Sequence, residues 1–512
     1  MRGEIGTANC SKHTAFSQVL ESYLRSIYNL LCLSSLFELH ITYAQSRGIV
    51  FPKRIAILSY SVLFLIIIPL VNLPLTAAGQ AEGPILRQRA EDDLPPAVKD
   101  PNLRIETVAE GLIRPTAMAF LGSNDILVLD KDNGTVRRII DGEVQEEPLL
   151  DVAVANDNGT NERGLLGLAV DKYNETTTYV FLYYTESGGG QDGDDSRGIV
   201  PAGNRLYRYE LVETPGYNGS LAKLINPKLL LDLPAIPGPR YNAGVVLVGH
   251  GENNTTTVYL MIGDLDHHRT QAQNYRDGPP PDGTGGILRV DIEGNPLPNP
   301  VLVGGNNNDE DTGMLGYYFA YGIRNGFGMD FDPVTGYLWD TENGPDNFDE
   351  INLVQPGFNS GWHDIQGLSS AEANSDIDLD EELEDFGGTG EYRDPEFVWN
   401  NTVGVTAIKF LNSTKLGEEY ENDMFVADIN NGRLYHFDLD EDRTELTLAG
   451  VLSDKVADNP GELDDVIFGT GFRSISDIEV GPDGYLYLLF YGPGKIMKVV
   501  PADEEQANEG NS

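Results

Sequence analysis

The sequence predicts an all-β fold, a β-propeller of six blades, and two observations favour it. A theme of turn residues followed by an apolar or aromatic strand recurs at residues 124–140, 177–185, 256–264, 336–354, 422–439 and 484–500. Imperfect β repeats separated by insertions of variable length are typical of propellers. Beyond residue 100 the chain lacks the apolar periodicity that marks amphipathic helices. The six copies of the theme predict six blades.

The propeller is expected to occupy residues 103–502 and to be closed by its own N-terminal strand. Leu103–Val108 form a spare strand ahead of the first repeat, placed to complete the last blade beside strands from residues 484–500. An acidic tail follows at residues 503–512. The two cysteines, Cys10 and Cys32, both precede this body, so no disulfide stabilises it.

The first hundred residues are expected to lie outside the propeller. Residues 53–79 contain a basic pair, an apolar run from Ile55 to about Val71 and then small residues, which is the order of an export signal. A single membrane anchor at residues 55–75 is the alternative, and both place the body outside the cytoplasm. Residues 1–52 are interpreted as an over-extended translation start, or else as a second membrane segment. Residues 80–102 are expected to be a polar linker.

The acidic composition limits the classes of partner. The chain carries 80 Asp and Glu against 35 Lys and Arg, a formal net charge of −45. Such a surface repels nucleic acid and anionic membranes, so nucleic acid is excluded as a partner. N-x-Ser/Thr sequons recur in predicted turns, for example at Asn133, Asn174 and Asn412, and glycosylation is expected if the chain is exported.

Residues 316–362 carry the strongest functional signal. Arg324 and Asn325 lie between Gly322 and Gly326, which suits a loop whose backbone approaches a ligand closely. Residues 342–350, with the sequence ENGPDNFDE, form an oxygen-rich turn. Hard cations prefer oxygen ligands, including backbone carbonyls of turns. The stretch therefore predicts a ligand loop followed by a metal loop.

These two loops, followed by the Gly-Phe-Asn-Ser-Gly-Trp element at residues 357–362, resemble the signature of the soluble PQQ-dependent sugar dehydrogenases, the glucose/sorbosone dehydrogenase family. The resemblance implies a six-bladed propeller that oxidises an aldose at its anomeric carbon to the lactone, with PQQ and Ca²⁺. Its implied partners are a small-molecule sugar and an electron acceptor. A non-catalytic, Ca²⁺-stabilised extracellular binding module is the alternative function, and a lactonase-type propeller hydrolase is a third, which the order of the motifs disfavours.

The resemblance also implies roles for individual residues. Glu162 begins an element whose first residue faces the substrate in the family, although Gly-Leu-Leu-Gly after it also suits a simple tight turn. Asp264 ends a strand at the cofactor face. The residues implied to contact PQQ are Arg324, Asn325, Asn430 and Arg473. For Ca²⁺, Gly344 and Pro345 offer carbonyl oxygens, while Asp349 and Glu350 orient the loop or bind a second ion.

Several positions depart from the family pattern. Tyr241 occupies the place of the family's catalytic histidine, and an ordinary phenol titrates near pH 10, which makes it a poor base at neutral pH. His267 and His268, which follow Asp264, are alternatives, although paired histidines in a polar loop are commonly solvated. Ser474 and Ser476 align with two arginines that clamp the cofactor. Arg473 is one step out of register, and Asn430 stands where a lysine is expected.

Overall fold

The computed structural model describes residues 95–157, 161–216, 219–251, 255–297, 301–303, 313–371 and 374–502. The chain divides into two compact units, Met1–Ala81 and Glu82–Ser512, and all described residues belong to the second. The predicted extension, export or anchor segment and acidic tail lie outside the described residues, as does the linker up to residue 94. Within the described ranges, no helix is both long and apolar enough to cross a membrane.

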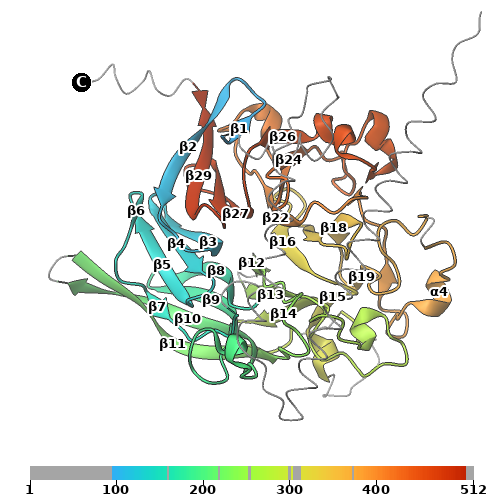
Figure 1. Ribbon diagram of the computed structural model, residues 1–512, viewed down its shortest axis with the longest axis horizontal. Coiled ribbons are helices and arrows are strands. Elements are labelled where there is room, and N and C mark those ends of the chain that lie inside the picture. Colours follow the sequence, from blue (N-terminus) through green and yellow to red (C-terminus); the bar gives the residue numbers. More distant parts are fainter. Residues whose placement is uncertain are drawn as a thin grey trace, which may run out of the picture. The chain divides into compact units, whose positions relative to one another are not determined.

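In the described ranges, strands form six sheets (Figure 1). The first sheet contains β3 (Pro115–Gly122), β4 (Asp125–Asp130), β5 (Thr135–Ile140), β6 (Glu143–Val144) and β7 (Leu150–Asp151). The second contains β8 (Leu165–Asn174), β9 (Thr177–Glu186), β10 (Gly203–Gly216) and β11 (Gly219–Leu233). The third contains β12 (Val246–His250), β13 (Thr256–Ile262), β14 (Gly286–Asp291), β15 (Tyr318–Tyr321), β19 (Phe358–Asn359) and β20 (Glu391–Tyr392).

The fourth sheet contains β16 (Gly326–Phe331), β17 (Leu338–Glu342), β18 (Asp349–Val354), β21 (Phe397–Trp399) and β25 (Val456–Ala457). The fifth contains β22 (Val405–Phe410), β23 (Met424–Asp428), β24 (Leu434–Phe437), β26 (Ile467–Thr470) and β1 (Ala97–Val98). The sixth contains β27 (Ile475–Val480), β28 (Leu486–Phe490), β29 (Lys495–Pro501) and β2 (Leu103–Glu110). A short α-helix, α4 (Leu379–Glu382), lies in the loop after β19.

The sheets succeed one another around a centre. One edge strand of each sheet contacts the corresponding edge strand of the next sheet, in the order β3, β8, β12, β16, β22 and β27, and β27 contacts β3 again. Each copy of the repeated sequence theme supplies strands of a different sheet, outward of the strand nearest the centre. The prediction of an all-β propeller is therefore confirmed. The cyclic contact matters for function because it places loops from every sheet around one central cavity.

The N-terminal strand closes this ring as predicted. β2 pairs antiparallel with β29, with Leu103 opposite Pro501 and Glu110 opposite Lys495. The last sheet thus contains strands from both ends of the propeller. Pairing covers an edge of β29 that would otherwise present unpaired backbone groups.

The core lies between neighbouring sheets, where apolar side chains of facing strands interlock. Between the fourth and fifth sheets, Trp339, Trp399 and Phe397 are fully buried together with residues of β22, β23 and β24. Aromatic side chains bury large apolar areas and therefore dominate such contacts. These rigid interfaces fix the positions of the strand ends from which the functional loops begin.

Candidate functional site

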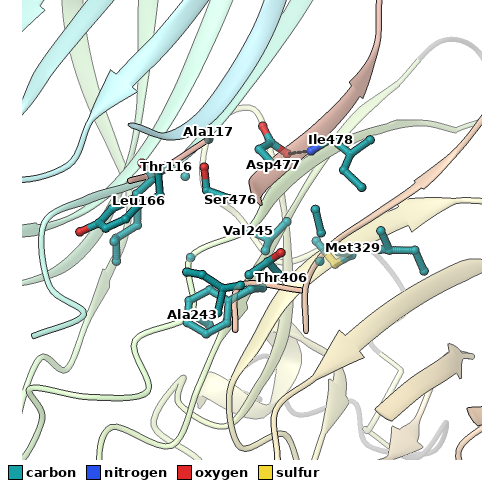
Figure 2. Close-up of a pocket in the computed structure, with 18 of the residues that line it drawn as sticks. Thr116, Ala117, Leu166, Ala243, Val245, Met329, Thr406, Ser476, Asp477 and Ile478 are labelled. Carbon is teal, nitrogen blue, oxygen red and sulfur yellow. Dashed lines mark hydrogen bonds between the residues drawn. The ribbon is translucent and has the colours of Figure 1, made fainter. Parts of the chain in front are cut away.

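A cavity of about 390 Å³ lies at the centre of the propeller, lined by the first strands of all six sheets. Figure 2 shows Leu166, Val245, Met329 and Ile478 among the side chains that surround it. Connecting loops add polar groups to the same lining, among them Lys131, Asn161, Glu162 and Asn343. The cavity therefore combines apolar walls with a polar set of loop residues, as small-molecule sites commonly do.

Glu162 connects loops of three sheets. Its carboxylate accepts a hydrogen bond from the backbone N–H of Tyr241 at 2.6 Å and from the side-chain amide of Asn325 at 3.4 Å. Burial raises the pKa of Glu162, and these hydrogen bonds oppose the shift. The structure thus brings Glu162, Tyr241 and Asn325, which are far apart in the sequence, into one contiguous group.

Arg324 is the cation of this group. Its backbone N–H donates to Oε1 of Glu342 at 2.6 Å, and its guanidinium donates to the carbonyl oxygens of Asn343 and Gly344 at 2.7 and 2.9 Å. The guanidinium carbon also lies 4.0 Å from the ring centroid of Tyr241. A guanidinium held by carbonyls and covered by an aromatic face is well fixed in position.

Asp264 lies beside this cation, fully buried at the end of β13. Its Oδ2 accepts a hydrogen bond from the indole N–H of Trp362 at 2.7 Å, and its Oδ1 accepts one from the backbone N–H of His267 at 3.2 Å. Burial raises the pKa of the Asp264 carboxyl. The buried carboxylate of Asp264 thus links the loop of His267 to that of Trp362.

His267 lies beside this group with an exposed side chain, in agreement with the solvated-loop interpretation. Its ring lies 5.9 Å from the Tyr241 ring and 6.2 Å from the Trp362 ring, between centroids. Its Nδ1 lies 4.0 Å from Oδ2 of Asp264, while 55% of the side chain remains exposed. His268 points elsewhere and pairs with Asp282 at 2.6 Å.

A strained backbone segment carries His267. Leu265, Asp266 and His267 have φ values of 51°, 63° and 71°, so three successive non-glycine residues adopt the left-handed region. That conformation costs roughly 1–2 kcal/mol per residue. Such strain is concentrated at functional sites, where surrounding contacts impose it. The hydrogen bond from His267 N–H to Asp264 is one of those contacts.

In the predicted metal loop, Asp349 acts as a clamp. Its Oδ2 accepts hydrogen bonds from the N–H groups of Val403 and Gly404, both at 2.7 Å, and its Oδ1 accepts one from the N–H of Gly344 at 3.0 Å. With three backbone donors on one buried carboxylate, Asp349 fixes the loop. Of the two roles expected for Asp349, orienting the loop or binding a second ion, these hydrogen bonds favour the first.

The carbonyl and carboxylate groups of this loop surround a very small space. Gly344, Pro345, Glu342 and Glu350 contribute to the lining of a cavity of about 10 Å³, close to the least that holds one water molecule. Glu350 is buried and accepts a hydrogen bond from the N–H of Gly367 at 2.7 Å. The space is therefore of atomic size, and Arg324, Phe348 and Trp362 line it together with the oxygen-bearing residues.

Two predicted cofactor residues lie apart from the cluster around Arg324. Asn430, on the turn between β23 and β24, is exposed, and its backbone N–H donates to the carbonyl of Val403 at 3.2 Å. Arg473 is exposed just before β27. Ser476 lines the central cavity, and its hydroxyl donates to the carbonyl of Pro115 at 2.8 Å.

Sequence reasoning missed three residues of the site. Trp362 was present only as the last residue of a motif, and Glu342 only as the start of the metal loop. Lys131 gave no signal, because a Lys-Asp pair after a strand is an ordinary turn. Its ammonium group lines the central cavity and donates to the carbonyl of Asn161 at 2.9 Å, and burial lowers its pKa.

The fold and the site define a β-propeller with a polar and aromatic cluster of loop residues, which Glu162 and Asn343 connect to the central cavity. Residues 112–498 match the family model described as Glucose / Sorbosone dehydrogenase, and the chain belongs to this family. The resemblance inferred from the motifs is thereby confirmed.

One curated protein and two solved structures illustrate the similarity, and the structures share the fold. An aldose sugar dehydrogenase of Escherichia coli K12 is 26% identical over 407 residues, which cover 78% of this chain and 93% of that protein. Among solved structures, a putative glucose dehydrogenase of Thermus thermophilus has a TM-score of 0.55 at 24% identity, covering 78% of this chain and all of that one. The PQQ-bound aldose sugar dehydrogenase of Streptomyces coelicolor has a TM-score of 0.53 at 21% identity, with coverages of 79% and 99%.

Proposed function

We propose that this protein oxidises an aldose at its anomeric carbon to the lactone with PQQ as cofactor, and that its six sheets are the six blades of one propeller. The observation that carries the proposal is the cluster in which Arg324 contacts Tyr241 and the carbonyls of Asn343 and Gly344. Family membership supports the oxidation of sugars, and the PQQ-bound relative supports the cofactor.

Two buried polar atoms favour a polar ligand beside Arg324. Among the described residues, Nε of Arg324 and Oδ1 of Asn325 have no hydrogen-bond partner. Buried polar atoms of this kind are expected to find a partner in a ligand or in water. Since PQQ carries three carboxylates, Arg324 and Lys131 would supply the cationic complement, so these residues fit the cofactor. When bound, PQQ supplies a quinone that accepts hydride.

For the metal, the residues fit a single hard cation at the loop after β17. Gly344 and Pro345 lie at this small space together with Glu342 and Glu350. Ca²⁺ prefers such carboxylate and carbonyl oxygens. The guanidinium of Arg324 already donates to the carbonyl of Gly344, so the cation and Arg324 would share that oxygen.

His267 is the best placed base, in preference to Tyr241. Histidine ionises near neutral pH, which suits a group that takes the proton of the anomeric hydroxyl. Because Nδ1 faces Asp264 at 4.0 Å, Nε2 is the nitrogen that would receive the proton. Asp264 would then hold the imidazole and stabilise its charged form, as a carboxylate beside a catalytic histidine does.

A non-catalytic binding module is the second candidate. Ser474 and Ser476 favour it, because they replace two arginines of the family's cofactor clamp and supply no charge. Location is part of the proposal as well. The export-signal pattern supports a secreted protein, or one anchored by residues 55–75, that passes its electrons to an acceptor outside the cytoplasm.

The proposal is tested by reconstitution of the purified chain with PQQ and Ca²⁺. We expect stoichiometric PQQ binding and aldose-dependent reduction of an artificial electron acceptor. Binding of PQQ without turnover on any aldose would favour the binding module, and absence of PQQ binding would refute the dehydrogenase proposal.

A further inference from the structure

An imidazole and two carboxylates meet at one end of the fifth sheet. Asp423 lies directly before β23, His436 lies within β24, and Asp438 lies directly after β24. Nε2 of His436 lies 2.9 Å from Oδ2 of Asp423 and 3.6 Å from Oδ1 of Asp438. One ligand atom of each residue lies within 4.8 Å of those of the other two. These three residues are called the His-Asp-Asp cluster.

The His-Asp-Asp cluster lies at the end of the fifth sheet opposite to the proposed reaction site. Strand β22 begins at Val405, whose carbonyl accepts a hydrogen bond from the side chain of Asn343 in the loop after β17. It ends at Phe410, which is paired with Met424, the residue that follows Asp423. The length of an extended strand, roughly 16 Å, therefore separates the two ends. The cluster is thus distinct from the sites proposed above for the sugar, PQQ and Ca²⁺.

The distances within the cluster suit three ligands of one small divalent ion. Zn²⁺ binds a histidine nitrogen at about 2.0–2.1 Å and a carboxylate oxygen at about 2.0–2.2 Å. Bonds of this length in a tetrahedral site separate neighbouring ligand atoms by roughly 3.3 Å. The separations of 2.9 and 3.6 Å around Nε2 of His436 lie on either side of that value. An ion can therefore bind all three side chains after small movements, and water completes the coordination.

The backbone fixes two of the three ligands through separate segments. The carbonyl of Asp423 accepts a hydrogen bond from the N–H of Leu411 at 3.0 Å. The carbonyl of Asp438 accepts one from the N–H of Thr447 at 2.8 Å. His436 itself belongs to a strand that is paired on both sides, with β23 and with β26. The ligands are therefore largely preorganised, which lowers the entropic cost of binding.

Aromatic side chains cover one side of the imidazole. The ring centroid of His436 lies 5.1 Å from that of Phe425, 5.2 Å from that of Tyr420 and 6.3 Å from that of Phe468. The side chain of His436 is 21% exposed, whereas that of Asp438 is 61% exposed. An ion thus has an entry path past Asp438 and an apolar wall behind His436, an environment that strengthens charge interactions.

The two carboxylates of the cluster lie close together, and this favours a cation between them. Burial raises the pKa of the Asp438 carboxyl, His436 opposes the shift, and the neighbouring carboxylate of Asp423 adds to it. With a neutral imidazole the cluster carries two negative charges, which a divalent ion balances. The ion then takes the place of the proton that otherwise relieves the repulsion.

We propose that the His-Asp-Asp cluster binds a divalent transition-metal ion of the Zn²⁺ type, which fastens the segment before β23 to β24. Imidazole nitrogen is a ligand for Zn²⁺ and its first-row neighbours, whereas Ca²⁺ takes oxygen ligands. The ion therefore differs in kind from the Ca²⁺ proposed at the loop after β17. Because it binds the folded state, it stabilises the propeller by mass action. The inference does not depend on the proposed function.

The test titrates Zn²⁺ into the purified, chelator-treated chain by calorimetry, with Ca²⁺ kept in excess throughout. The wild type should bind one equivalent of Zn²⁺ that His436→Gln binds at least tenfold more weakly, because the variant lacks the nitrogen ligand. Asp438→Asn should weaken the same equivalent, and its exposed position guards against loss of the fold. His268→Gln is the matched control, since His268 pairs with the single carboxylate of Asp282, and it should bind Zn²⁺ as the wild type does.

Thermal unfolding provides a second measurement on the same samples. Zn²⁺ should raise the melting temperature of the wild type and of His268→Gln, and the rise should be much smaller in His436→Gln and Asp438→Asn. Equal Zn²⁺ binding in the wild type and in both cluster variants would overturn the proposal. It would also be overturned if excess Ca²⁺ displaced the Zn²⁺ equivalent, since the cluster would then be an ordinary acidic surface that attracts any cation.

Discussion

The guanidinium of Arg324 lies over the ring of Tyr241, with 4.0 Å between the guanidinium carbon and the ring centroid. A tyrosine in this position offers its aromatic face to a cation, and the interaction does not require the phenol to ionise. The relationship therefore gives Tyr241 a positioning role for Arg324. In the proposed reaction, the proton of the substrate is then left to another residue, and His267 is the neighbouring side chain proposed to take it.

The first prediction separates these two roles. His267→Gln should lower kcat by about 10²–10⁴-fold, the usual contribution of general-base catalysis, while PQQ affinity stays the same. Tyr241→Phe should retain most of the activity because the aromatic face remains. The measurements are steady-state kinetics with an aldose and a PQQ titration of each variant.

His268→Gln is the matched control for this prediction, because His268 belongs to the same loop but pairs with Asp282. It should leave kcat unchanged. If Tyr241→Phe abolished turnover and His267→Gln did not, the assignment of the base would be wrong and Tyr241 would hold the role expected from its place in the motif.

The repeats could be predicted because each depends on local sequence, and the closing strand because it is the one strand left over before the first repeat. β-Repeats, Arg324-Asn325 and the Gly-Asp strand end are recognisable within a few residues. The place of His267 could not be predicted, because it depends on the left-handed run at residues 265–267 and on Trp362 from a loop almost a hundred residues later. The choice between the two roles expected for Asp349 likewise required knowing that Val403 and Gly404 lie beside it.

A second prediction concerns the serines aligned with the cofactor clamp. Ser476 lines a cavity of about 390 Å³, so Ser476→Arg has room to extend a guanidinium into it. A charge-assisted hydrogen bond contributes about 1.5–3 kcal/mol, and we therefore expect PQQ to bind at least tenfold more tightly. Equilibrium titration of PQQ checks this. Ser413→Arg, on a loop outside the lining of the central cavity, is the control, and equal tightening in both variants would point to a non-specific effect of charge.

The third prediction is a pH dependence of stability that arises from Glu342. Burial raises the pKa of Glu342 to about 7, from an ordinary value of 4.5. The folded state thus holds the proton more tightly than the unfolded state. The stabilisation of the folded state that the protonated Glu342 contributes is fully present below about pH 4.5 and is lost as the pH rises through about 7. The melting temperature without added Ca²⁺ should therefore decrease as the pH is raised from about 4.5 to about 7.

Glu342→Gln tests the source of that dependence, because the amide cannot ionise in this range. The variant should show a smaller fall of melting temperature between pH 5 and pH 7.5 than the wild type. Burial raises the pKa of Asp340 and Glu350 in the same direction, so some dependence should remain. Parallel curves for the wild type and Glu342→Gln would exclude Glu342 as the titrating group.

The fourth prediction distinguishes metal binding from loop fixation. Millimolar Ca²⁺ should raise the melting temperature over that in a chelator, because a ligand of the folded state stabilises it by mass action. Glu350→Gln should reduce the rise. Asp349→Ala should lower the melting temperature even in the chelator, because it leaves three backbone N–H groups without their acceptor. The expected loss of unfolding free energy is roughly 2–5 kcal/mol. If Ca²⁺ produced no shift in the wild type, the metal proposal would fail, and the clamp would still stand.

The last prediction concerns closure of the propeller by β2. Ala109 is 4% exposed and packs in the core formed with β27, β28 and β29, whereas Thr107, two residues earlier, is exposed. Ala109→Asp would bury an unpaired carboxylate and should lower the melting temperature strongly, by several kcal/mol in free energy. Thr107→Asp adds the same charge to the same strand at a solvated position and should change stability by less than about 0.5 kcal/mol. Thermal unfolding of both variants measures the difference.

Equal stability of the two variants would mean that β2 does not pack against β29 in solution, and removal of residues 95–111 should then leave a folded propeller. If β2 closes the ring, that truncation instead exposes the edge of β29 and yields an aggregating chain, which size-exclusion chromatography distinguishes.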